Sequence, residues 1–156
     1  LFYSNETISD VFKIENPNDY DILYGDTIGV HDNGEIEYIR PLDLSLFWKH
    51  IPICHQSTFI NLKLHKEYLY DLNYKVSSVY DFLYNRYISG DNFKYINLPI
   101  SKYNMNGYSS HSLLWLWDYI RISLKYSKGK RHKVIFKIGS YSIMRLIKFL
   151  KKKKMV

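Results

Sequence analysis

The fold that this sequence predicts depends on ten residues, Asp21-Ile22-Leu23-Tyr24-Gly25-Asp26-Thr27-Ile28-Gly29-Val30. Their apolar and aromatic side chains are typical of a buried strand, and Gly25-Asp26 indicates a turn into a second strand that starts at Thr27. Asp32-Asn33-Gly34 then turns the chain back, because Asn-Gly accepts the positive φ angles of a tight hairpin. Residues 35–39 are expected to form the returning strand, with one face made by Ile36, Tyr38 and Arg40.

Short helices and strands alternate on both sides of this stretch. Apolar residues at helical spacing predict helices over residues 7–14, 62–70 and 79–87, the last of which ends at Gly90. Strands are expected at the end of residues 51–60 and on either side of Pro99, over residues 93–96 and 100–103. Such alternation predicts an α/β layer arrangement, and an apolar content of 46% is ample for a core.

The charge is distributed unevenly along the chain. Residues 1–118 contain all fifteen acidic residues and nine basic ones, whereas residues 119–156 contain thirteen basic residues and no acidic one. The pattern is helical from residue 112, breaks at 127–129 and continues in a second amphipathic helix to residue 154. We therefore expect residues 111–156 to form a helical, basic tail that packs on the body or on a bilayer and faces an anionic surface. The alternative is a solvated charge run.

Several kinds of site are not expected from the sequence. Cys54 is the only cysteine, which excludes an internal disulfide and favours a reducing, cytoplasmic setting. The six histidines show no metal-ligand spacing with one another or with Cys54, so no zinc site is predicted. A Gly-rich phosphate loop and a nucleophile elbow are also missing, which argues against a nucleotidase or an α/β-hydrolase.

Five blocks of sequence succeed one another in a recognisable order. They are Tyr24-Gly25-Asp26, then Asn33-Gly34, then Pro52-Ile53-Cys54-His55-Gln56-Ser57-Thr58-Phe59, then Tyr74-Lys75-Val76 with Tyr80-Asp81-Phe82, and finally Phe93-Lys94-Tyr95-Ile96. In this order they resemble the bacterial family 2 glycosyltransferases of polysaccharide and lipopolysaccharide biosynthesis. The Cys-His-Gln block, at its distance from the Tyr-Asp block, is the most specific part. The resemblance implies that residues 1–110 are the acceptor-side, C-terminal portion of a nucleotide-diphospho-sugar transferase fold of the GT-A type.

The same resemblance implies a donor half that this sequence does not match. In the family, a nucleotide-binding β/α unit comes first and ends in an acidic Asp-x-Asp-type motif, which holds a divalent cation on the donor diphosphate. Residues 1–5 resemble the segment immediately after that motif, and the chain opens on Leu1 rather than Met, so we expect upstream residues. A complete enzyme is expected to need Mg²⁺ or Mn²⁺, with the metal ligands outside this chain.

The resemblance also implies a general base at the start of the helix over residues 79–87. Family members carry there an acidic pair spaced one residue apart, and one of the two acids takes the proton of the acceptor hydroxyl. In this sequence Val79 occupies the first position and only Asp81 remains, so either Asp81 is the catalytic base or this copy is impaired. We favour the impaired copy. Without the resemblance, Asp81 would simply favour the positive N-terminus of its helix.

Three further residues are expected to bind substrate. The resemblance implies that His55 and Gln56 line the donor-sugar or acceptor pocket, and Asp26 is the third candidate. The competing interpretation is structural: His55 and Gln56 would satisfy backbone groups in a loop, and Asp26 would close a turn.

Together these observations predict a glycosyltransferase that moves a sugar from a nucleotide-diphospho-sugar to a glycan or lipid-linked acceptor. We expect a truncated or impaired copy, inactive by itself, at the periphery of the inner face of the cell membrane, where the basic tail meets anionic lipid. One alternative is a non-catalytic remnant or partner subunit. Another is a nucleic-acid-binding module that uses the tail and the sixteen tyrosines, although no recognised nucleic-acid-binding motif accompanies them.

Overall fold

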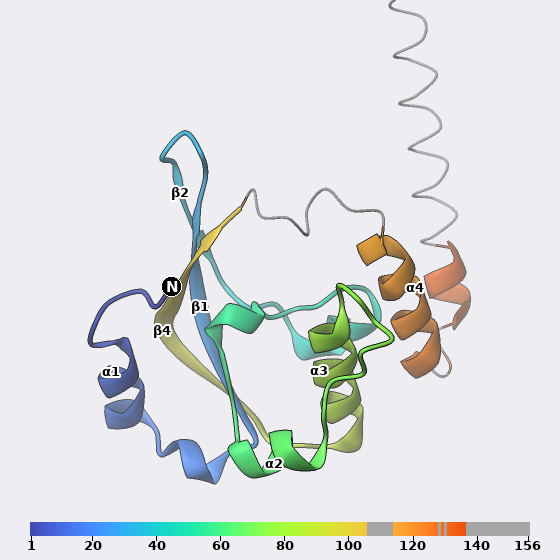
Figure 1. The fold of residues 1–156 in the computed structure, drawn as a ribbon, viewed down its shortest axis with the longest axis horizontal. Coiled ribbons are helices and arrows are strands. Elements are labelled where there is room, and N and C mark those ends of the chain that lie inside the picture. Colours follow the sequence, from blue (N-terminus) through green and yellow to red (C-terminus); the bar gives the residue numbers. More distant parts are fainter. Residues whose placement is uncertain (106–113, 128, 130, 137–156) are drawn as a thin grey trace, which may run out of the picture.

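The structure is a computed structural model that describes residues 1–105, 114–127, 129 and 131–136 (Figure 1). In chain order, with η for a 3₁₀ helix, its elements are α1 (Thr7–Ile14), η1 (Pro17–Asp19), β1 (Ile22–Val30), β2 (Ile36–Ile39), η2 (Leu44–Trp48), η3 (His55–Ser57), β3 (Thr58–Ile60), α2 (Leu62–Glu67), α3 (Ser78–Ser89), β4 (Phe93–Asn104) and α4 (Leu114–Tyr126).

Strand β1 is the centre of a mixed four-stranded sheet. β4 pairs with it in parallel over its whole length, from Ile22 opposite Phe93 to Val30 opposite Asn104. On the other edge, β3 pairs with residues 22–24 and β2 with residues 27–30, both antiparallel. The α/β class expected from the sequence is therefore confirmed, and the hairpin at Asn33-Gly34 is confirmed by a φ of 82° at Gly34.

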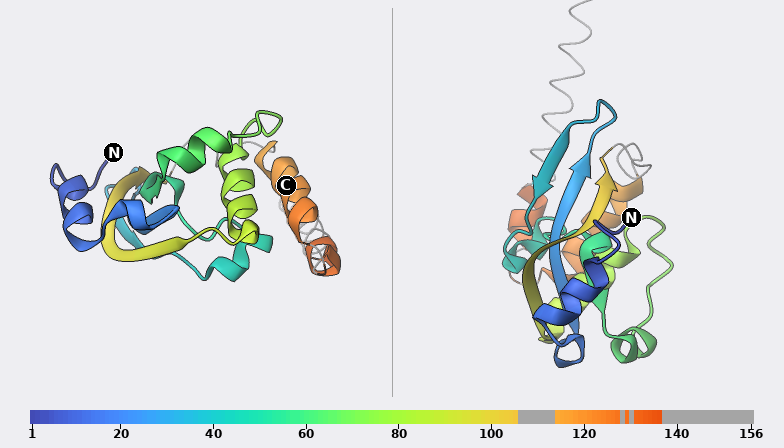
Figure 2. Two further views of the ribbon diagram at one scale, coloured as in Figure 1. Left: turned by 90° about the horizontal axis from the view of Figure 1, so that it is seen from below. Right: turned by 90° about the vertical axis from the view of Figure 1, so that its left-hand side faces the viewer.

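The sheet lies between two helical layers. α1 is on one side and α3 on the other, with α4 packed against the outer side of α3 (Figures 1 and 2). Because successive side chains of a strand point to opposite faces, Ile22 and Tyr24 join the core under α3, whereas Leu23 joins a smaller core with Val11 of α1. The helix α4, in the segment predicted to be a tail, thus packs on the body. The second predicted helix of the tail, to residue 154, lies mostly outside the described residues.

The larger core is built from stacked aromatic rings. Phe47 of η2 is completely buried, and its ring centroid lies 5.3–6.4 Å from those of Tyr80, Tyr84 and Tyr87 on α3. The hydroxyl of Tyr80 donates a hydrogen bond to the backbone carbonyl of Phe47, which satisfies a polar group that burial would otherwise penalise. Several of the sixteen tyrosines are therefore core residues of the contact between η2 and α3.

The turn predicted at Gly25-Asp26 is wrong. β1 runs straight through both residues, with a shift in its register against β4 around Asp26. A Cβ atom at Gly25 would lie 2.6 Å from the carbonyl oxygen of Leu98, so glycine is required here for the close approach of β4 and not for a turn.

Two other boundaries also differ from the prediction. The strands expected on either side of Pro99 are one continuous strand, because Pro99 sits opposite Asp26 at the register shift, where a missing N–H is tolerated. α2 ends at Glu67 and not at Tyr70, since the backbone of Tyr68 is extended. The end of α3 at Gly90 is confirmed, with a left-handed φ of 87°.

Candidate functional site

Asp26 is a buried carboxylate in the middle of the sheet. Its side chain is 0% exposed, and the strands on both edges of β1 supply its partners. The hydroxyl of Tyr38 on β2 donates to Oδ2 at 2.6 Å, and the hydroxyl of Tyr95 on β4 donates to Oδ1 at 2.9 Å. Burying a carboxylate is costly, and these two bonds offset part of that cost.

The negative charge of Asp26 changes the acidity of its partners. The hydrogen bond to Asp26, followed by burial, raises the pKa of Tyr38 from 10.0 to about 12. Burial and the same carboxylate also raise the pKa of Tyr95. The guanidinium carbon of Arg40 lies 5.8 Å from the centre of the Tyr38 ring. Asp26, Tyr38, Tyr95 and Arg40 thus form a polar group, which we call the Asp26 cluster.

The Asp26 cluster predicts alkaline sensitivity. Because the folded state raises the pKa of Tyr38 from 10.0 to about 12, its stabilisation is complete below pH 10 and is lost as the pH rises through about 12. In urea unfolding measured over this pH range, the wild type should lose more stability than Tyr38→Phe, which has no ionisable hydroxyl at position 38. Tyrosinate absorbance should also show the pKa of Tyr38 falling back in Asp26→Asn. If stability depends on pH in the same way in the wild type and in Tyr38→Phe, the hydrogen bond to Asp26 does not raise the pKa of Tyr38.

His55 and Gln56 lie in η3, which is tied to β1 through the next residue. Both are exposed, as expected of residues that meet a substrate, and partial desolvation lowers the pKa of His55. Ser57 is completely buried and donates to the backbone carbonyl of Asp26 at 2.9 Å. Its hydroxyl also lies 2.6 Å from that of Thr27 and 2.7 Å from that of Ser101. η3 is therefore held to the backbone at Asp26, while the Asp26 carboxylate is bound by the two tyrosines.

Asp81 takes part in a different contact, between α3 and α4. It is 5% exposed, and its Oδ1 lies 2.9 Å from Nζ of Lys125. Burial alone would lower the pKa of Lys125, but hydrogen bonds to Tyr126 and Asp81 raise it overall. Nearby, Oδ2 of Asp118 accepts a hydrogen bond from the backbone N–H of Val76 at 3.1 Å. α4 is thus fastened to the segment that leads into α3.

Val79 is half-buried and packs against the larger core. At the position that the resemblance assigns to a general base, the chain therefore has an apolar side chain that packs on the core. The neighbouring acid, Asp81, is ion-paired. Sequence reasoning gave no site role to Tyr95, although it lies in the block Phe93-Lys94-Tyr95-Ile96, or to Lys125, which no local pattern distinguishes. For Tyr38 there was a signal, since it shares a face of the predicted strand with Arg40.

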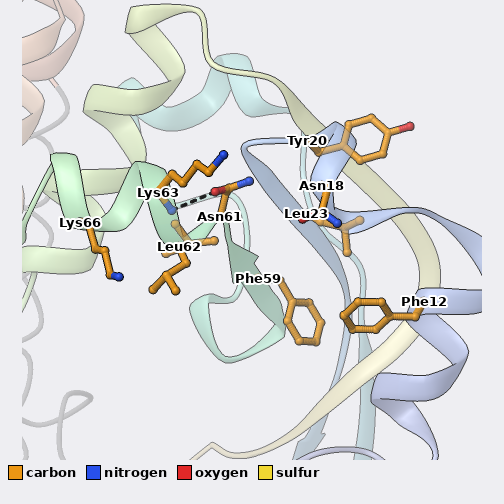
Figure 3. A pocket seen from close by; sticks show the side chains of 10 residues that line it. Phe12, Asn18, Tyr20, Leu23, Phe59, Asn61, Leu62, Lys63 and Lys66 are labelled. Atoms are coloured by element: carbon orange, nitrogen blue, oxygen red, sulfur yellow. Dashed lines mark hydrogen bonds between the residues drawn. The ribbon is translucent and has the colours of Figure 1, made fainter.

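A separate hollow of about 700 Å³ lies between α1 and α2. Its apolar wall includes Phe12, Leu23 and Phe59, all of which are labelled in Figure 3. Lys63 and Lys66 of α2 line another part of it. None of the predicted site residues borders this hollow, so it is distinct from the Asp26 cluster.

Neither a metal cluster nor a membrane-spanning helix occurs among the described residues. Over residues 1–105 and the described parts of 114–136, no group of three or more His, Cys, Asp or Glu side chains could hold a metal ion. Within the same ranges, no helix has the length and apolarity that crossing a bilayer requires.

Comparison with known proteins adds no relationship to these observations. No family model matches the chain, and neither a curated protein nor a solved structure matches it.

Proposed function

We propose that this chain is the acceptor-side portion of a glycosyltransferase of the GT-A type, which moves a sugar from a nucleotide-diphospho-sugar to a glycan or lipid-linked acceptor. The observation that carries the proposal is the convergence on β1 of sequence blocks that are far apart in the chain. Tyr24-Gly25-Asp26 is part of β1 itself, the Cys-His-Gln block is joined to it through Ser57, and the block at Phe93 opens β4 alongside it.

The fourth block belongs to the same unit. Tyr80 stacks on Phe47 in the core that also contains Tyr24. The start of α3, where the family carries its acidic pair, is therefore anchored to the face of the sheet that includes Tyr24. This coherence supports the interpretation of the blocks as parts of one packed unit and not as unrelated matches.

The described residues do not fit the divalent cation that the family uses. Asp26 has both carboxylate oxygens hydrogen-bonded to tyrosines, and Asp81 is ion-paired with Lys125. No cluster of three candidate ligands occurs among the residues that the structure describes. In the proposed enzyme, Mg²⁺ or Mn²⁺ and the donor diphosphate are held by a donor half, as the resemblance implies.

The proposed roles follow from what each side chain can reach. His55 and Gln56 are exposed and are the proposed contacts to the donor sugar or acceptor. Asp81 is 5% exposed and ion-paired with Lys125, which disfavours it as the base and supports an impaired copy. The same observation, together with Val79, favours a second candidate: a non-catalytic partner subunit that keeps the acceptor-side fold. The anionic membrane partner of the basic tail remains part of the proposal.

Nucleoside diphosphate release tests this proposal. The 156-residue chain should neither hydrolyse nor transfer from nucleotide-sugars in Mn²⁺, and calorimetry should show no nucleoside diphosphate binding tighter than millimolar. The same chain joined to a nucleotide-binding donor half of the GT-A type should release nucleoside diphosphate when an acceptor is added. Micromolar binding of a nucleoside diphosphate by the chain alone would contradict the proposal that a separate donor half binds the donor. If the complete protein is inactive, the non-catalytic partner subunit is favoured.

A further inference from the structure

The geometry points to a saccharide-binding surface on the Asp26 cluster, in which the rings and hydroxyl oxygens of Tyr38 and Tyr95 contact the sugar and Asp26 positions them. This inference rests on the proposed function and names the substrate class and the contact residues of that site.

The hydroxyl protons of Tyr38 and Tyr95 are committed to Asp26. A tyrosine hydroxyl has one proton to donate, and the shortest bonds of both hydroxyls, 2.6 Å and 2.9 Å, go to Asp26. With those protons committed, each hydroxyl oxygen can meet a ligand only as an acceptor. The surface therefore selects ligands that carry O–H or N–H donors.

The buried carboxylate also strengthens and orients these acceptors. Asp26 polarises the hydroxyls that donate to it, so their oxygens become better acceptors than those of free tyrosines. It also holds the two rings in place from opposite edges of β1, and the Tyr95 ring is further supported by Tyr24, with centroids 5.8 Å apart. Preorganised groups bind at a lower entropic cost.

The open surfaces of the cluster narrow the ligand class. Tyr38 is 50% exposed and Tyr95 is 37% exposed, so apolar ring area stays open to solvent beside the polar groups. The guanidinium of Arg40, 5.8 Å from the Tyr38 ring, repels a cationic ligand and can donate to ligand oxygens. Exposed Asn97, whose Oδ1 lies 3.3 Å from the Tyr95 hydroxyl, adds a polar amide.

A saccharide combines the features that this surface selects. It has hydroxyl donors for the tyrosine oxygens, ring and hydroxyl oxygens for Arg40, and C–H faces that pack on aromatic rings. The surface is also accessible, because Tyr38 and Tyr95 are both exposed.

Saturation-transfer NMR on the 156-residue chain tests this inference without a donor or any transfer step. The probes are methyl glycosides of glucose, galactose and N-acetylglucosamine and their disaccharides. At least one should bind with a millimolar Kd, and Tyr38→Ala should weaken it about tenfold or more. Tyr3→Ala is the matched control, since Tyr3 is 42% exposed and lies 5.3 Å from a lysine but outside the cluster, and it should bind as the wild type does.

A second pair of variants separates binding from folding. Tyr38→Phe and Tyr95→Phe keep the rings but remove the acceptor oxygens, so each should lose its preference for a probe over the matching deoxy analogue. Asp26→Asn should weaken binding and lower the pKa of Tyr38 together, a link that a purely structural role would not produce. The inference is overturned if no probe binds the wild type, or if the tyrosine variants bind as tightly as it does.

The outcome is separable from that of the proposed function. If saccharide binding depends on Tyr38 but the complete protein transfers no sugar, the saccharide-binding surface is supported and the transferase function is contradicted. If the complete protein transfers sugar and Tyr38→Ala leaves the acceptor KM unchanged, the transferase function is supported and the saccharide-binding surface is contradicted.

Discussion

Truncation of Phe47 to alanine is expected to lower the free energy of unfolding by about 3–5 kcal/mol. Phe47 is completely buried and its ring stacks on Tyr80 and Tyr84, so the truncation leaves a cavity lined by rings that cannot all close on it. It also loosens η2 against α3. Urea unfolding followed by circular dichroism measures the effect.

Phe12 provides the control for that experiment. It is also a phenylalanine, but it is 58% exposed, so Phe12→Ala should change the free energy of unfolding by about 0.5 kcal/mol or less. Equal losses in the two variants would show that Phe47 is not the centre of the core.

Replacing Val79 by aspartate, in a chain completed with a donor half, is expected to raise sugar transfer by about 10²-fold or more. The new carboxylate would stand where the resemblance implies the general base, two positions before an aspartate that is already ion-paired. The measurement is the initial rate of nucleoside diphosphate release with a saturating acceptor. In the completed protein that keeps Val79, Asp81→Asn should abolish the remaining activity if Asp81 acts as a substitute base.

Controls are needed because Val79 is half-buried against the core. An unsolvated carboxylate there costs more than an unpaired neutral polar group, which costs about 1–3 kcal/mol, so circular dichroism must show that the variant is folded. Val79→Asn introduces a side chain of nearly the same shape as aspartate but without a proton-accepting carboxylate, so it should not raise the rate of sugar transfer. A completed wild type that already turns over at ordinary enzyme rates, unchanged by Val79→Asp, would show that Val79 is not a lesion.

Local sequence determined the elements whose signals lie within a few residues. The helix Thr7–Ile14, the hairpin at Asn33-Gly34 and the end of α3 at Gly90 all agree with the sequence, because helical periodicity and positive φ angles are properties of short segments. The family, the donor, the acceptor and the membrane partner stay predictions.

Only the tertiary structure decided what the buried polar groups do. Gly25-Asp26 has the composition of a turn, yet β4 approaches so closely that the segment is extended and glycine is required. Asp26 bonds to Tyr38 and to Tyr95, twelve and sixty-nine positions away, and Asp81 pairs with Lys125, forty-four positions away. From the sequence alone, an aspartate can close a turn, cap a helix or bind a substrate. Which of these it does depends on the strand or helix that packs beside it, and that packing is set by burial of the whole core and not by neighbouring residues.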